Sequence, residues 1–190
     1  MTSSLHNVTT GGTRRTVRIA LMTAAAVASG YLLIAIPNVE LVTATVAMAG
    51  LMMGPLPGAI VGTLAMAIFG SLNIFGIPYP PVWLTQMLGE ATTGVLFGLV
   101  RFSYDRANPL RRAWIGGSLA AAATLFYDLI TNLAFPAGLM VPLSSWWPYL
   151  IAGIPFAITH LVSNVLIFAL VVPVAWSRIG RRYMEKRPSS

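Results

Sequence analysis

The apolar residues of this chain gather in long runs, which short polar or Pro/Gly-rich segments separate. Each run is long enough for a helix and lacks the strict polar/apolar alternation of a half-buried strand. The pattern therefore predicts an all-α protein with six helices, at residues 17–36, 41–53, 58–72, 82–102, 113–135 and 147–176.

The break between the second and third helices needs a physical reason, because the apolar stretch around it is continuous from about 39 to 72. Residues 54–58 read Gly-Pro-Leu-Pro-Gly. Proline removes a helical hydrogen bond and glycine weakens a helix, so this sequence favours a turn over one long helix. The predicted organisation is a loose polar tail at 1–16, a six-helix domain at 17–176 and a basic tail at 177–190.

Composition indicates where these helices lie. The chain has 190 residues, of which 56% are hydrophobic and 9% charged, with a mean hydropathy of +0.76. Soluble domains carry roughly 25% charged residues, and no soluble fold of this size buries so much apolar surface. The helices are therefore predicted to cross a membrane. The chain has no cysteine, which excludes disulfides and thiolate chemistry.

The basic residues support six spans. All twelve lie in three clusters, before the first helix, between the fourth and fifth, and after the sixth. Six spans place every cluster on one side of the bilayer, whereas fusing the two short helices would move the middle cluster outside. The positive-inside rule thus predicts cytoplasmic N- and C-termini. The net charge of +7 then reflects cytoplasmic edges and gives no indication of nucleic-acid binding.

Acidic and histidine side chains inside the predicted spans are few. They are Glu90, Asp128 and His160, and each has an amide side chain one turn away on its helix, at Gln86, Asn132 and Asn164 respectively. A charged group in the bilayer costs at least ~2.5 kcal/mol, so these side chains should face an interior or a wet cavity.

Position along the helices predicts where such a cavity opens. At 1.5 Å per residue, Glu90 and Asp128 are expected in the outer half of the membrane and His160 near the middle. The direct interpretation is a binding pocket open to the outside, formed by the ionisable and amide residues together with Trp83 and Trp146 near the outer ends. The alternative is that these polar groups only join helices by hydrogen bonds.

The pocket chemistry restricts the ligand. No Lys or Arg lies in any span at the depth of the two carboxylates, so a simple carboxylate substrate is disfavoured. A cationic ring or several hydrogen-bond donors would suit the carboxylates, and an aromatic side chain would stack on such a ring. We expect a thiamine-like, pyrimidine or other nitrogen-rich vitamin or vitamin precursor.

Small residues repeat every four positions in two places. Ala20, Ala24 and Ala28 form one stripe in the first helix. Glycines form the other, at positions 50, 54, 58 and 62 and again at 94 and 98. Such spacing permits close contact between helices, either within the chain or with another membrane subunit.

Several activities lack their motifs. The chain has no GxxxxGK[ST] loop, so it is not expected to bind ATP itself, and it has no HExxH or Cys/His cluster for zinc. No nucleophile elbow is present. We expect no enzymatic activity, no resident cofactor and no bound metal.

Two segments resemble a known family. Residues 36–45, Ile-Pro-Asn-Val-Glu-Leu-Val-Thr-Ala-Thr, and residues 49–62, which include the Gly-Pro-Leu-Pro-Gly turn, resemble the substrate-binding S component of energy-coupling-factor (ECF) transporters. Residues 127–132 resemble a segment of some members. The resemblance covers roughly residues 17–175 and implies a six-helix protein of the bacterial inner membrane. It also implies a vitamin ligand near the outer face.

The same resemblance implies partners. S components dock on a transmembrane coupling subunit, which two ATPases power, and the family's docking alanines look matched by Ala20, Ala24 and Ala28. Two other classes stay open. One is a membrane scaffold similar to the rod-shape protein MreD, and the other is an intramembrane enzyme that uses Glu90, Asp128 and His160 as acid and base.

Overall fold

A computed structural model describes residues 2–180 and 182–183 of the chain, with side chains from residue 12 onward. The described residues form helices and connecting turns, without a strand. The all-α prediction is therefore confirmed. Arg181, Lys186 and Arg187 of the predicted basic tail lie outside the described residues.

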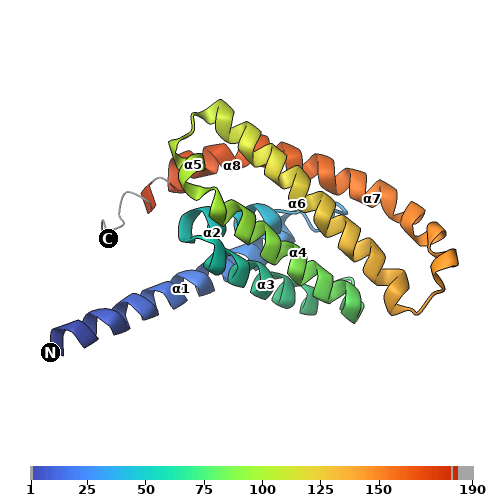
Figure 1. Cartoon of the computed structure of the whole chain (residues 1–190), viewed down its shortest axis with the longest axis horizontal. Coiled ribbons are helices and arrows are strands. Elements are labelled where there is room, and N and C mark those ends of the chain that lie inside the picture. Colours follow the sequence, from blue (N-terminus) through green and yellow to red (C-terminus); the bar gives the residue numbers. More distant parts are fainter. Residues whose placement is uncertain (1, 181, 184–190) are drawn as a thin grey trace.

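Helix α1, Thr2–Leu32, differs from the prediction at both ends. Its N-terminal part is helical, so the predicted loose tail is wrong, and in Figure 1 this part extends away from the other helices. Its C-terminal end comes four residues before Ile36. Residues 33–41 form a loop, which contributes to the wall of the site described below.

Helices α2, Val42–Met53, and α3, Pro55–Ser71, form the predicted short hairpin. The turn is shorter than predicted, because Gly54 alone separates the two helices. Gly54 has φ of 102°, a conformation that residues with a Cβ rarely adopt. Pro55 begins α3, where its missing N–H costs no helical hydrogen bond. Both prolines of the interruption therefore fit inside the helix.

The next helices surround the basic loop. Helix α4 is Pro80–Leu99, the short α5 is Arg101–Arg106, and α6 is Pro109–Gly138. The Asn108 side chain caps α6 by accepting a hydrogen bond from the Arg111 backbone N–H at 2.8 Å. The loop predicted at 103–112 is thus largely helical. Buried Arg112 holds this corner together by donating to the backbone carbonyls of Tyr104 and Asp105.

The C-terminal part is one long helical stretch after the short 3₁₀ turn η1, Leu143–Ser145. It comprises α7, Trp147–Leu166, and α8, Val172–Ala175, with π-helical turns η2, Ile167–Val171, and η3, Trp176–Gly180. Pro173 cannot donate a backbone hydrogen bond, and the π-helical turn η2 lies immediately before α8. Figure 1 shows α6 and α7 running side by side.

Close glycine contacts hold the centre of the bundle. A Cβ added at Gly94 of α4 would overlap the backbone of Gly58 in α3, and one at Gly50 of α2 would overlap the Gly94 carbonyl. The glycine stripes are therefore internal contacts that bring α4 directly against α2 and α3. Around them pack the buried side chains of Leu51 and Phe97.

Two helical stretches among the described residues are long and apolar enough to cross a membrane by length and composition, Pro109–Gly138 and Trp147–Gly180. Helices α2 and α3 are apolar but shorter. Many large apolar side chains around the molecule are exposed, which is unfavourable in water and suits a lipid environment.

Candidate functional site

A cavity of about 640 Å³ lies between the ends of α1, α3, α4, α6 and α7. The loops at 33–41 and 72–79 also contribute to its wall. Four of the predicted site residues line it, and these are Gln86, Asp128, Asn132 and His160. The structure therefore brings together polar groups from three helices that are far apart in the sequence.

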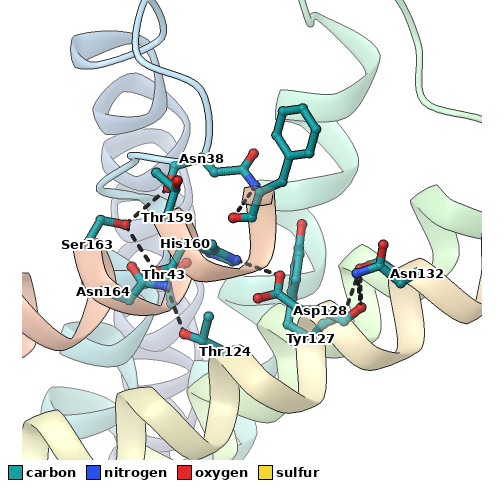
Figure 2. A network of polar contacts seen from close by, with 12 residues as sticks. Asn38, Thr43, Thr124, Tyr127, Asp128, Asn132, Thr159, His160, Ser163 and Asn164 are labelled. Atoms are coloured by element: carbon teal, nitrogen blue, oxygen red, sulfur yellow. Dashed lines mark hydrogen bonds and ion pairs between the residues drawn. The ribbon is translucent and has the colours of Figure 1, made fainter. Parts of the chain in front are cut away.

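Asp128 and His160 form a buried pair across α6 and α7. Nδ1 of His160 lies 2.8 Å from Oδ1 of Asp128 in a hydrogen bond, which Figure 2 shows. The two residues are 9% and 5% exposed. Direct contact puts them at one depth, although the sequence predicted different depths. The predicted depths were counted from the helix ends, and α6 continues to Gly138, three residues beyond the predicted end at Phe135, which accounts for part of the difference.

Neighbouring side chains fix this pair. The Tyr127 ring packs edge-on against the His160 ring, with centroids 5.3 Å apart. The Asn132 side chain donates to the backbone carbonyl of Asp128 at 2.8 Å, and a Cβ at Gly153 of α7 would overlap that amide. The absence of a side chain at Gly153 thus leaves room for the Asn132 amide against α7.

Glu90 and Asn164 do not line the cavity and lie in the protein interior, each 1% exposed. Thr43 of α2 donates to Oε1 of Glu90 at 2.6 Å. Asn164 donates to the Thr124 hydroxyl at 2.9 Å. Both residues therefore join helices through polar contacts.

Five buried polar atoms of these predicted residues have no hydrogen-bond partner in the structure. They are Oε1 of Gln86, Oε2 of Glu90, Oδ2 of Asp128, Nε2 of His160 and Oδ1 of Asn164. Four are oxygen acceptors, and two of these, Oε1 of Gln86 and Oδ2 of Asp128, belong to residues that line the cavity. Buried polar groups without partners are unfavourable, and water or a ligand with donor groups would satisfy them.

The loop at 33–41 supplies part of the wall, and only its residues 33–36 were predicted to lie inside the first helix. Asn38 adopts a left-handed conformation with φ of 57°. Its side chain donates to the Phe156 carbonyl at 3.0 Å, and its own carbonyl accepts a hydrogen bond from Ser163 at 3.1 Å. These bonds fasten the loop to α7 (Figure 2). The Pro37-Asn38 signal marks a turn, but nothing in it indicates contact with a helix so distant in sequence.

Glu40 follows on the same loop and lines the cavity. Loss of hydration raises the pKa of its carboxyl above the ordinary value, and the nearby His160 opposes this shift. Glu40 was not among the predicted site residues, and the structure places it on the cavity wall.

Aromatic rings form much of the remaining wall. The residues concerned are Phe69, Phe75, Tyr127, Phe135 and Phe156. The predicted tryptophans lie elsewhere, because Trp83 donates to the Met66 carbonyl and packs on Gly70, while Trp146 donates to the Val141 carbonyl. Neither tryptophan lines the cavity. Within the described residues, no three His, Asp or Glu side chains gather as metal ligands would.

This arrangement agrees with a family comparison. The model of the family described as "ECF-type riboflavin transporter, S component" matches residues 12–176. The chain belongs to this family. It is therefore a transporter S component of the bacterial membrane, and neither the scaffold nor the enzyme alternative receives support. No curated protein and no solved structure matches this S component.

A second cavity lies on the surface of this S component. It is an apolar groove of about 500 Å³ between α1 and α3, lined by Ala20, Ala24 and Ala28 together with Thr23, Val27, Leu64 and Ile68. All three alanines are exposed. The two small-residue stripes thus differ, because the glycines pack inside the bundle and the alanines face outward.

Proposed function

We propose that this S component binds riboflavin in the cavity between α1, α3, α4, α6 and α7 and delivers it for import. The observation that carries the proposal is the cavity itself, which combines an aromatic wall with a surplus of hydrogen-bond acceptors in a chain of the riboflavin transporter family. Ligand pockets of this kind usually have volumes of about 300–1,000 Å³. The cavity volume of about 640 Å³ lies in this range.

The chemistry of riboflavin suits both parts of the wall. Its flat fused ring would stack on Phe69, Tyr127 or Phe156, since aromatic rings attract each other in offset and edge-on contacts. Its hydroxyl groups and ring N–H are donors, which the acceptors Asp128 and Gln86 require. A vitamin rich in donors was also expected from the carboxylates alone.

The proposed topology has six spans, formed by α1, α2, α3, α4, α6 and the stretch beginning with α7, with both termini in the cytoplasm. The basic residues support it. Arg101 follows the end of α4 and Arg112 lies in the first turn of α6, both outside the cavity lining, as the positive-inside rule requires for a cavity that opens outward.

The exposed groove of Ala20, Ala24 and Ala28 is the proposed docking surface for the transmembrane coupling subunit, to which two ATPases would supply energy. The groove supports this role because small side chains allow a partner helix to approach closely. The absence of a P-loop from the sequence agrees with ATP use by separate subunits.

Quenching of flavin fluorescence on titration with the detergent-purified protein tests the ligand. We expect Asp128→Asn to weaken riboflavin binding by about 10- to 100-fold, because a charge-assisted hydrogen bond contributes about 1.5–3 kcal/mol. Glu90→Gln should have a smaller effect, since Glu90 lies behind the cavity wall. Asp105→Asn is the matched control, because Asp105 contacts Trp176 far from the cavity.

Failure of the wild-type protein to quench flavin fluorescence would refute riboflavin as the ligand. Unchanged affinity in both the Asp128→Asn and the Glu90→Gln variant, at normal folded yield, would show that these carboxylates only join helices. A thiamine-like cation is the second candidate, because Glu40 and Asp128 are the carboxylates on the wall. Competition of unlabelled thiamine with riboflavin distinguishes the two ligands.

A further inference from the structure

The charges around the cavity are unbalanced. Glu40 and Asp128 line it, and Glu90 is buried among the same helices. Among the described residues, His160 is the only basic side chain on the wall, and no lysine or arginine belongs to the lining. The wall therefore carries carboxylates with a single histidine to oppose them, and that histidine is already bonded to Asp128.

Two arginines at the other ends of these helices do not compensate. Arg112 is sixteen residues from Asp128 along α6, which corresponds to about 24 Å. Arg101 begins α5, beyond the end of α4 at Leu99, and follows Gln86 by fifteen positions in the sequence. Neither arginine belongs to the cavity lining.

We propose that the cavity selects the unphosphorylated form of its ligand and that Glu40 and Asp128 impose this selection. The inference rests on the proposed function, because it concerns the vitamin bound at the same site. An ionised carboxylate repels a phosphate ester. A protonated carboxyl group donates one hydrogen bond but supplies no positive charge. In either state the described lining offers a phosphate neither an arginine nor a lysine side chain.

The buried atoms without hydrogen-bond partners also favour an unphosphorylated ligand. Oδ2 of Asp128 and Oε1 of Gln86 accept hydrogen bonds, and a phosphate at pH 7 also offers mainly acceptors. The wall oxygens and the phosphate oxygens cannot form hydrogen bonds with each other, because both are acceptors. The hydroxyl of the unphosphorylated ligand can, in contrast, donate a hydrogen bond to these oxygens.

The test compares riboflavin with its phosphate ester, flavin mononucleotide, in the fluorescence-quenching titration. We expect the ester to bind about 100-fold more weakly or worse, because like charges in a poorly hydrated site cost several kcal/mol. Glu40→Lys should reduce the ratio of the two affinities about tenfold or more. Ser144→Lys is the matched control, since Ser144 is exposed and outside the cavity lining, and it should leave the ratio unchanged.

The possible outcomes separate the two proposals. Equal binding of riboflavin and its ester overturns the selection and leaves riboflavin as the ligand. An unchanged ratio in a folded Glu40→Lys variant overturns the role of Glu40. If the wild-type protein binds no flavin, the proposed ligand is wrong, and the selection is then decided with thiamine against thiamine phosphate and pyridoxal against pyridoxal phosphate. The proposed selection is refuted if any of these phosphate esters binds as tightly as the corresponding unphosphorylated vitamin.

Discussion

The hydrogen bond between Asp128 and His160 gives the sharpest energetic prediction. The bond is 2.8 Å long and buried, and it joins α6 to α7. The same two helices carry an uncharged counterpart one turn away, between Thr124 and Asn164, at 2.9 Å. The two pairs share helices, burial and bond length, so they differ mainly in the ionisable character of the first.

The expected magnitudes follow from that difference. A hydrogen bond to a charged group contributes about 1.5–3 kcal/mol to stability, whereas interhelical hydrogen bonds in membrane proteins average about 0.6 kcal/mol. The coupling energy between Asp128→Ala and His160→Ala should therefore exceed that between Thr124→Val and Asn164→Ala by roughly 1–2 kcal/mol. Each single variant is expected to cost more than its coupling energy, because it also leaves a buried partner unpaired.

The measurement is equilibrium unfolding in mixed micelles of dodecyl sulfate and a mild detergent, followed by circular dichroism, for both double-mutant cycles. The cycle removes effects that each substitution has alone, such as the loss of the contact between His160 and the Tyr127 ring. Coupling energies that are equal for the two pairs, or a coupling energy near zero for Asp128 and His160, would show that the pair has no ionic component.

Three further predictions concern topology, docking and packing. Single cysteines at Ser103 and Ser144 should differ in intact cells, with only the second labelled by an impermeant reagent, and labelling at 103 would refute six spans. Ala24→Leu should lower uptake while riboflavin binding persists, because the added bulk fills the exposed groove, and parallel loss of binding would make the groove part of the ligand site. Gly94→Ala should lower the free energy of unfolding by about 1–3 kcal/mol, because its Cβ would overlap backbone, whereas Gly117→Ala has no neighbour closer than 3.8 Å and should be neutral. Similar unfolding curves for the two alanine variants would contradict the close helix contact.

Local patterns predicted much of the fold. Long apolar runs predicted the helices, because helix formation and membrane insertion depend on neighbouring residues. The short hairpin was also predicted, because Gly54 and Pro55 restrict the backbone wherever they occur. Helix ends were less accurate. Residues 33–36 were predicted as helix, since nothing local prevents α1 from continuing past Leu32.

The candidate site was likewise predicted only in part from the sequence. Composition alone singled out Asp128 and His160, because ionisable groups are costly in a membrane and therefore rare. Their direct contact, and the position of Glu90 behind the cavity wall, depend on how α4, α6 and α7 pack. No local signal records such a contact between residues separated by 32 positions.

The small-residue stripes give the clearest physical reason for this limit. Alanines and glycines at four-residue spacing look alike in the sequence, since both mark a helix face without bulk. Only the tertiary structure places the glycine face against another backbone and leaves the face of Ala20, Ala24 and Ala28 open. The sequence by itself determined that both faces permit close approach, whereas the packing of the whole bundle decided which face is already occupied.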